Sequence, residues 1–321
     1  MRSRSLSLTG ATGFVGWHVA EAFIRSGWRV RAVVRRGNTR PVPAGATVVE
    51  ADLTPAALAA AFAGCEVVVH AAALIRARDD AAFAAVNVEG TRAAVEGAAR
   101  VDARFVHISS QAAGGTGTPD APRRESDPPA PVNAYGRSKL AAENVVRRAG
   151  IARWTILRPC AVYGPRDRGF LPLFRMARRG LFLVPTAATA SFTLIHVSDL
   201  VRAVQMAVVS DAARGETLFV GHSVPQTGAD VLRAIAAVQG RPFRPMRIPG
   251  TIFSAAAALG DLSWKLGIKP LVDSGRLAEL RAEGFVCSVD RVRDVLGFVA
   301  GTDLASGVAM TQRWYVEHGW L

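Results

Sequence analysis

The sequence contains little cysteine, and its arrangement argues against a metal site. Cys65, Cys160 and Cys287 lie far apart, and they form no Cys-x-x-Cys pair and no His/Cys cluster with the spacing of metal ligands. We therefore expect no bound metal and a reducing, cytoplasmic location.

The sequence also lacks a long uninterrupted hydrophobic run. Its most apolar stretch, residues 248–268, is interrupted by Pro249, Gly260, Asp261 and Lys265. A membrane-spanning helix needs about 20 residues with few or no charges, so we predict no transmembrane segment. A buried helix, or an amphipathic helix that lies partly at the surface, fits this stretch better, and contact with a membrane surface stays an open alternative.

Acidic residues are fewer than basic ones, which raises the question of a nucleic-acid partner. The chain has 39 Lys and Arg against 26 Asp and Glu, a formal net charge of +13. Its arginines are scattered over the whole length, and no RNP-like or zinc-finger pattern accompanies them. We therefore expect an arginine-rich surface and no nucleic-acid partner. No Gly-x-Ser-x-Gly elbow occurs either, so a serine hydrolase is set aside.

Short apolar runs alternate with helical patterns from Ser5 to Leu157, the arrangement that builds a parallel sheet covered on both faces. We expect an α/β fold with a doubly wound parallel sheet, a Rossmann fold, and a smaller, mainly helical C-terminal substrate domain. The predicted strands are Ser5–Leu8, Arg29–Val34, Thr47–Val49, Glu66–His70, Phe105–Ile108 and Thr155–Leu157. The predicted helices between them are Phe14–Ser26, Pro55–Phe62, Ala81–Arg100 and Asn133–Ala149.

The second half of the chain is less regular. A helix at Ser198–Val209 and a strand at Glu216–Val220 are assigned back to the main sheet. The predicted dinucleotide-binding domain is therefore 1–165 plus 198–222, and the predicted substrate-binding domain is 166–197 plus 223–321. Further helices are expected from Gln226, Ile252, Ser274 and Thr302. The Gly- and Pro-rich loop from Gly114 to Val132 is either a substrate lid or a surface connector.

A glycine-rich turn follows the first predicted strand and opens a helix. Its glycines have the spacing Gly-x-x-Gly-x-x-Gly. Glycine permits a tight turn and lets the backbone approach a pyrophosphate, whose charge the helix N-terminus stabilises. We predict that the turn binds a dinucleotide through Gly10, Thr12, Gly13, Phe14, Val15 and Gly16.

The residues after the next three strands are expected to complete the cofactor site. NAD sites usually have an acidic residue after the second strand, whereas an arginine accommodates a 2′-phosphate, so Arg35 favours NADP over NAD. Asp52 follows the third strand, where a carboxylate can accept a hydrogen bond from the adenine amine. Small residues follow the fourth strand and let the backbone come close to the cofactor. The predicted contacts are Arg35, Arg36, Asp52, Leu53, Ala71, Ala72 and Ala73.

A tyrosine and a lysine one helical turn apart indicate acid/base chemistry. Tyr135 and Lys139 are neighbours on one face of a predicted helix. An opposite charge a few Å away lowers a tyrosine pKa of about 10 by roughly 1–3 units, so we expect Lys139 to make Tyr135 a usable acid or base. Ser109 and Ser110 end the fifth strand, at the edge of the sheet where ligands bind in such folds.

These residues predict a hydride-transfer site. Ser110 would hydrogen-bond a substrate carbonyl or hydroxyl, Tyr135 would exchange its proton, and hydride would pass to or from the nicotinamide. Lys139 would also hold the nicotinamide ribose, and Ser109 and Tyr135 are counted among the cofactor contacts. Asn87 would position a water or a backbone carbonyl in a proton relay, or would stabilise its helix.

The motifs stand together in the order of a known family. They are Thr9–Gly16, Asp52-Leu53, His70-Ala71-Ala72, Asn87–Thr91, Ser109-Ser110, Tyr135 with Lys139, Arg158-Pro159, Val162–Pro165 and His196–Leu200. With them the chain resembles the extended short-chain dehydrogenase/reductases, also called the NAD-dependent epimerase/dehydratase family. The resemblance implies a catalytic Ser110, Tyr135 and Lys139, and it places Pro159 and Val162 beside the nicotinamide. It also implies a small-molecule substrate and a homodimer.

Two departures from the family pattern count against a sugar-nucleotide substrate. Enzymes of that kind tend to carry Val-Tyr-Gly after the serines, where this chain has Ala112-Ala113-Gly114-Gly115, and they tend to show an Arg-Asp-Phe run that residues 187–195 lack. The chain looks more similar to the 3β-hydroxysteroid dehydrogenase and dihydroflavonol reductase branch. That branch implies an oxidoreductase that interconverts a secondary alcohol and a ketone or aldehyde of a small, hydrophobic substrate.

Two alternatives stay beside this interpretation. A sugar-nucleotide epimerase or dehydratase would use Tyr135 on a transiently oxidised sugar and would keep its NAD tightly bound. A non-catalytic nucleotide-binding protein with a regulatory or assembly role would keep the fold, although the intact Ser110, Tyr135 and Lys139 argue against it.

Overall fold

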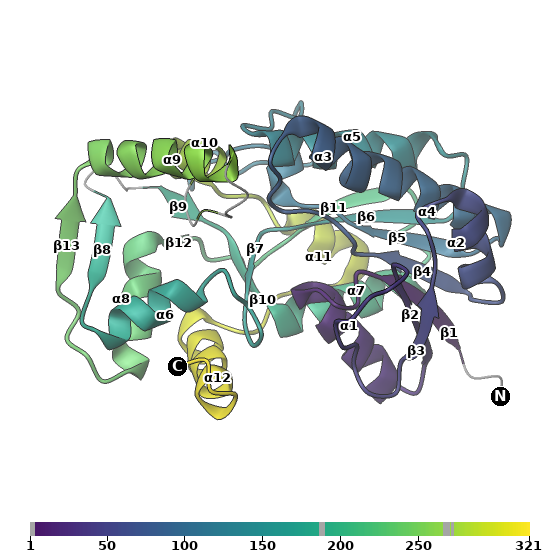
Figure 1. The fold of residues 1–321 in the computed structure, drawn as a ribbon, viewed down its shortest axis with the longest axis horizontal. Coiled ribbons are helices and arrows are strands. Elements are labelled where there is room, and N and C mark those ends of the chain that lie inside the picture. Colours follow the sequence, from purple (N-terminus) through teal and green to yellow (C-terminus); the bar gives the residue numbers. More distant parts are fainter. Residues whose placement is uncertain (1–3, 186–189, 266–269, 271–272) are drawn as a thin grey trace.

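The structure is a computed structural model that describes residues 4–185, 190–265, 270 and 273–321. A seven-stranded sheet forms its larger part (Figure 1), in the order β11-β6-β5-β4-β1-β2-β3 with every neighbouring pair parallel. The strands are β1 Ser5–Thr9, β2 Arg29–Val34, β3 Thr47–Glu50, β4 Val67–His70, β5 Arg104–Ile108, β6 Trp154–Pro159 and β11 Glu216–Val220. The predicted doubly wound α/β sheet is confirmed.

Helices cover both faces of this sheet, because its inner strands bury side chains on both sides. On one face, α1, α7 and α11 share a hydrophobic cluster with Leu6 and Leu8 of β1. On the other face, α2, α4 and α5 pack against Val68 and Phe105. These helices are α1 Phe14–Arg25, α2 Pro55–Phe62, α4 Gly90–Arg100, α5 Ala134–Arg148, α7 Val197–Val209 and α11 Asp290–Leu296. The strand order reverses between β1 and β4, which is the point where ligands bind in sheets of this kind.

The helix predicted at Ala81–Arg100 is interrupted in the structure. It consists of α3 (Asp80–Phe83), a π-helical segment η1 (Ala84–Glu89) and α4. Asn87 lies in the π-helical segment and is fully buried. Such wide turns inside helices are often found at functional sites.

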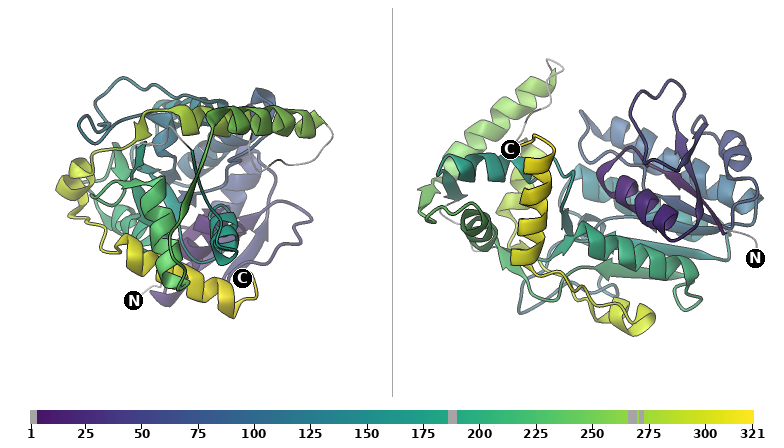
Figure 2. Two further views of the ribbon diagram at one scale, coloured as in Figure 1. Left: turned by 90° about the vertical axis from the view of Figure 1, so that its left-hand side faces the viewer. Right: turned by 90° about the horizontal axis from the view of Figure 1, so that it is seen from below.

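The rest of the chain builds a second, smaller part with its own core (Figure 2). Tyr163, Phe174, Phe182, Ile235 and Tyr315 are the large buried side chains of that core. Its helices are α6 Leu171–Arg178, α8 Gly228–Val238, α9 Gly250–Lys265, α10 Ser274–Arg281 and α12 Leu304–Glu317. Its short strands are β7 Ala161–Tyr163, β8 Phe182–Pro185, β9 Ser191–Phe192, β10 Leu194–His196, β12 Gln226–Thr227, β13 Pro245–Ile248 and β14 Gly284–Phe285.

The two domain ranges derived from the sequence stay a prediction. Residues 187–189, part of the segment that departs from the sugar-nucleotide pattern, lie outside the described residues, as do residues 266–268 of the apolar stretch.

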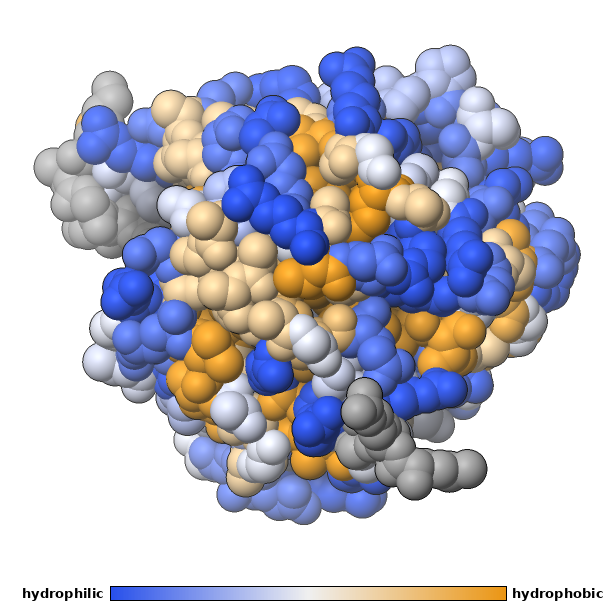
Figure 3. All heavy atoms as spheres, turned by 90° about the vertical axis from the view of Figure 1, so that its right-hand side faces the viewer, coloured by the Kyte–Doolittle hydropathy of each residue, from blue (hydrophilic) through white to orange (hydrophobic). Residues whose placement is uncertain are grey.

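One face of the molecule is mixed in hydropathy. Hydrophobic and hydrophilic residues are interspersed over the face at the right of Figure 1, as Figure 3 shows. Within the part of the chain that the structure describes, no helix combines the length and the hydropathy that crossing a membrane requires.

Candidate active site

The glycine turn after β1 is packed too closely for side chains. Gly10 has a φ of +80°, and a Cβ on it would lie 2.7 Å from the carbonyl carbon of Ala71. A Cβ on Gly16 would lie 2.2 Å from the carbonyl oxygen of Gly10. Gly13 is the N-cap of α1 and makes no side-chain cap, so the start of the helix is free for an anion. Thr12, Phe14 and Val15 are half-buried at this turn. The turn therefore fits the pyrophosphate of a dinucleotide.

The end of β2 is basic and exposed. Arg35 and Arg36 follow the strand, and Arg36 Nε donates to Asp52 Oδ2 at 3.0 Å. Two residues predicted to contact different parts of the cofactor thus contact each other. The side chains of this pair are 70% and 57% exposed, so the pair contributes little to stability.

Asn87 ties the segment after β4 to the helix that carries Tyr135. Its Oδ1 accepts from the Leu74 amide at 2.7 Å, and its Nδ2 donates to the Leu74 carbonyl and to Ser138 Oγ, both at 2.9 Å. Ala71–Ala73, the residues just before Leu74, lie between the glycine turn and Asn87 and are half-buried. Asn87 therefore does hold a backbone carbonyl, as one of its two predicted roles requires, while the proton relay stays a prediction.

Ser110 and Tyr135 meet at the carboxyl edge of the sheet. Ser110 follows β5, and its Oγ accepts from the Ala112 amide at 3.2 Å, which caps the short 3₁₀-helix η2 (Gln111–Ala113). Tyr135 lies in the first turn of α5, where the Asn133 side chain caps the Gly136 amide at 2.8 Å. The hydroxyl group of Ser110 lies close enough to the phenol of Tyr135 to lower its pKa. The sequence predicted this pair, and the structure brings it together.

The pKa of Tyr135 differs from the prediction. The pKa is raised from 10 to about 12: burial is the largest cause, the charge of Glu279 adds to it, and only the Ser110 hydroxyl lowers it. Lys139 does not contribute, because its ammonium group is turned toward strand β5. The prediction that Lys139 lowers the pKa of Tyr135 is wrong for this structure.

Lys139 is buried and bonded to the strand beside Ser110. Its Nζ donates to the Ile108 carbonyl at 2.9 Å and lies 3.4 Å from His107 Nε2. Burial lowers the pKa of the lysine from 10.5 to about 8, and the carboxylate of Glu143 opposes the shift. The charge of this side chain therefore changes close to neutral pH.

Ser109 belongs to a buried ionic network behind Lys139. Its hydroxyl donates to Glu143 Oε1 at 2.6 Å, and Arg158 donates to both carboxylate oxygens at 2.9 and 2.7 Å. Arg147 adds a further bond to the same carboxylate at 2.9 Å. The hydroxyl of Ser109 is therefore already bonded to Glu143, and this bond competes with the predicted contact between Ser109 and the cofactor. Sequence reasoning missed Glu143, although its position four residues after Lys139 indicates the same helical face.

Two further predicted cofactor residues lie past the end of β6. Pro159 ends that strand opposite Val220 of β11, and Val162 is half-buried in β7, which pairs with β10. Both lie at the carboxyl edge of the main sheet, on the side where Ser110 follows β5. Their contact with the nicotinamide stays a prediction.

The C-terminal part of the chain closes one side of the site. Asn133 Nδ2 donates to Glu279 Oε1 of α10 at 2.8 Å, two residues before Tyr135. The loop 114–132 is bonded through its backbone to the segment 284–288: Gly117 pairs with Val286 at 3.0 Å and Arg123 with Ser288 at 2.9 Å. Of the two predicted roles of this loop, the bonds favour the connector, which here forms a wall of the site. They do not favour a freely moving lid.

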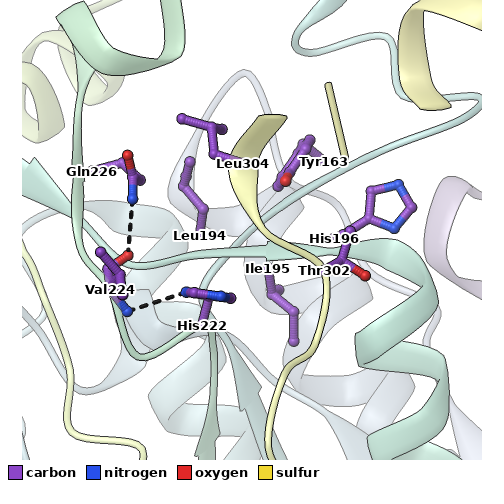
Figure 4. A pocket seen from close by; sticks show the side chains of 9 residues that line it. All are labelled: Tyr163, Leu194, Ile195, His196, His222, Val224, Gln226, Thr302 and Leu304. Carbon is purple, nitrogen blue, oxygen red and sulfur yellow. Dashed lines mark hydrogen bonds between the residues drawn. The ribbon is translucent and has the colours of Figure 1, made fainter. Parts of the chain in front are cut away.

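A small pocket lies elsewhere in the molecule (Figure 4). It is lined by Tyr163, Leu194, Ile195, His196, His222, Val224, Gln226, Thr302 and Leu304. None of the predicted catalytic residues lines it, and His222 Nδ1 accepts from the Val224 amide at 3.1 Å within it. Among the described residues, no group of three or more His, Cys, Asp and Glu side chains is placed to hold a metal ion.

The chain is similar to known proteins over most of its length. Residues 6–221 match the model of the NAD dependent epimerase/dehydratase family. The chain is 34% identical over 324 residues to a ceramide reductase of Caulobacter vibrioides, across 98% of this chain and 96% of that protein. It is 30% identical over 316 residues to the 4-hydroxy-2-methyl-3-oxo-4-farnesyl-3,4-dihydroquinoline-1-oxide ketoreductase of Stigmatella aurantiaca, across 91% and 90%. Among solved structures, MoeE5 in complex with UDP-glucuronic acid and NAD is 26% identical with a TM-score of 0.77, across 98% and 99%.

Proposed function

The chain belongs to the NAD-dependent epimerase/dehydratase family, and we propose that within this family of enzymes it is an NADPH-dependent reductase of a ketone on a lipophilic substrate. The observation that carries the proposal is the proximity of Ser110 to the phenol of Tyr135, one turn from Lys139 and at the sheet edge that the glycine turn also reaches.

The pair is suited to donating a proton. A bound nicotinamide would supply the hydride that forms the new C–H bond at the carbonyl carbon. Ser110 and Tyr135 would both donate hydrogen bonds to the carbonyl oxygen, and the phenol proton would move to that oxygen as its negative charge develops. A pKa of about 12 keeps Tyr135 protonated at neutral pH, which favours the reductive direction. The ammonium group of Lys139 would hold the end of the strand that precedes Ser110, through its bond to the Ile108 carbonyl.

The substrate class rests on the relatives and on the sequence departures. Two similar proteins are named for lipophilic substrates, a ceramide and a farnesyl-substituted dihydroquinoline. The segment after Ser110 lacks the Val-Tyr-Gly pattern of sugar-nucleotide enzymes and has small residues instead. We therefore propose a long-chain or polycyclic ketone that is reduced to a secondary alcohol.

The choice of NADPH rests on the basic end of β2. Arg35 and Arg36 are exposed there, and no acidic residue stands between Val34 and Glu50 to accept the ribose hydroxyls of NAD. The exposed contact of Arg36 with Asp52 is weak enough to give way to a 2′-phosphate.

The test is a reduction assay with long-chain ketones. We expect NADPH to be consumed in a one-to-one ratio with alcohol formed, and NADH to be used less well. Tyr135→Phe should lower kcat by about 10²- to 10⁴-fold, the range that general acid catalysis supplies, while NADPH still binds. Normal turnover by Tyr135→Phe would contradict the assigned role of the phenol.

A sugar-nucleotide epimerase is the second candidate, because MoeE5 shares the fold across the whole chain. That activity would leave the purified protein with bound NAD and no net consumption of added cofactor. Interconversion of UDP-sugars with no ketone reduced would replace our proposal.

A further inference from the structure

Helix α9 has an ordinary inward side. Phe253 and Trp264 are half-buried, and Ala257 and Gly260 are buried. Their spacing of three or four residues places them on one side of the helix. These side chains pack α9 against the rest of the molecule. The opposite side of the helix is not needed for this packing.

The side of α9 that faces solvent is also apolar. Ile252, Leu259 and Leu262 are 57%, 68% and 53% exposed. Alanines at two positions between them are exposed as well, and the spacing keeps all five on one face of the helix. We call this face the apolar stripe; it consists of Ile252, Ala255, Ala256, Leu259 and Leu262. An exposed helical face without a charged residue is unusual in a soluble monomer and marks an interaction site.

The chain just before α9 is strongly basic. Arg241, Arg244 and Arg247 are exposed, and Met246 beside them is 53% exposed. No acidic residue occurs from Val231 to Gly260. Figure 1 shows that β13, which carries Arg247, leads directly to the start of α9, and Figure 2 shows α9 along the outer margin of the molecule.

We propose that the apolar stripe docks on an anionic lipid bilayer, with α9 lying flat in the interface and the arginines against the headgroups. An interfacial helix buries an apolar face among lipids while basic residues beside it contact anionic headgroups. With 16 residues, α9 is too short for a membrane span. A second copy of the chain is a poorer occupant, since residues 231–260 offer no carboxylate to pair with the arginines, whereas anionic headgroups do.

The docking surface is connected to the candidate active site. Helix α10 packs against α9, and its Glu279 accepts the hydrogen bond from Asn133 at the start of the Tyr135 helix. On the other side, Arg76 donates to the Pro270 carbonyl at 2.9 Å, which brings Ile75, 72% exposed, near the chain between α9 and α10. Docking would thus hold the C-terminal wall of the site against the bilayer. In this step the inference rests on the proposed function, because only a lipophilic ketone needs such a route.

The test is flotation of the purified full-length chain with vesicles, without cofactor or substrate. We expect binding to vesicles of phosphatidylcholine with phosphatidylglycerol and at least tenfold weaker binding to phosphatidylcholine alone. The single variant Leu259→Asp should weaken the binding at least tenfold. The double variant Leu259→Asp with Ile252→Asp should also weaken it at least tenfold. Arg244→Ala with Arg247→Ala should remove the preference for anionic vesicles. The control is Val48→Asp, at an apolar position in β3 that is 52% exposed, and it should bind like the unchanged chain.

Each outcome separates docking from catalysis. Binding that Leu259→Asp leaves unchanged would overturn the role of the stripe, as would a dimer in sedimentation that this substitution dissociates while no vesicle binds. Thermal unfolding shows whether each variant is folded. Vesicle binding without any ketone reduction would support the docking proposal and contradict the proposed function. Ketone reduction without vesicle binding would support the proposed function and contradict the docking proposal.

Discussion

At the scale of single residues, Lys139 is the group in the site whose charge changes near neutral pH. Its pKa of about 8 contrasts with the value of about 12 for Tyr135, so the phenol stays protonated where the lysine titrates. We expect kcat/KM for ketone reduction to fall as the pH rises through about 8, because a neutral lysine holds the Ile108 carbonyl, two residues before Ser110, more weakly than an ammonium group does. A profile measured with saturating NADPH that stays flat to pH 10 would contradict this.

The same shift distinguishes loss of activity from loss of structure. The folded state binds the Lys139 proton more weakly than the unfolded chain does, since the pKa falls from 10.5 to about 8 on folding. Between these values the unfolded chain carries the extra proton, so the contribution of Lys139 to stability rises with pH. Unfolding driven by Lys139 therefore cannot explain a loss of activity above pH 8, and circular dichroism across this range serves as the control.

Glu143 is the residue whose removal should cost most stability. Burial alone would raise the pKa of its carboxyl, but the hydrogen bonds and charge of Arg158, with help from Ser109 and Arg147, lower it below its usual value. Glu143→Gln would leave the buried Arg158 without a counter-charge. We expect the free energy of unfolding in urea to fall by about 3–5 kcal/mol.

The matched control for this prediction is Arg147. Its side chain is 32% exposed, whereas that of Arg158 is 3% exposed, and both contact the same carboxylate. Arg147→Ala should therefore cost about 1 kcal/mol or less. Equal losses for Glu143→Gln and Arg147→Ala would show that burial of the ion pair does not decide the cost.

At the scale of elements, the π-helical segment η1 determines how the segment after β4 meets helix α5. Asn87→Ala would remove the bonds to both backbone groups of Leu74 and to Ser138. We expect kcat/KM to fall by about 100-fold, the cost of misplacing reacting groups by about 1 Å. Glu89→Gln, an exposed position of the same segment, should leave kcat/KM unchanged. Similar rates for Asn87→Ala and the unchanged enzyme would remove the positioning role.

The elements also show where sequence patterns are informative. All seven strands of the main sheet were predicted to within about two residues, because buried parallel strands are continuous apolar runs. The break in the helix predicted at Ala81–Arg100 was not, since it depends on bonds from Asn87 to Leu74, thirteen residues earlier in the chain. Helices α6 and α11 were also missed, as were the strand pairs β8–β13 and β9–β14, which join short segments far apart in the sequence.

At the scale of the whole molecule, the positions of the candidate site residues were predicted best where a single helix or strand determines them. Tyr135 and Lys139 share helix α5, and Ser110 follows β5, so the place of all three at one sheet edge followed from the order of motifs. The direction in which Lys139 points, and with it the pKa of Tyr135, depends on tertiary burial that no spacing reveals. The same holds for Glu279, which reaches the site from α10.

The backbone bonds between Gly117 and Val286, and between Arg123 and Ser288, also bear on how the protein is made. Synthesis on the ribosome runs from the N-terminus, so the glycine turn and the Ser110–Tyr135 pair emerge more than a hundred residues before their C-terminal wall. A nascent chain can thus complete its cofactor site while its substrate side is still missing. Residues 284–288 finish the wall only once they too have been synthesised.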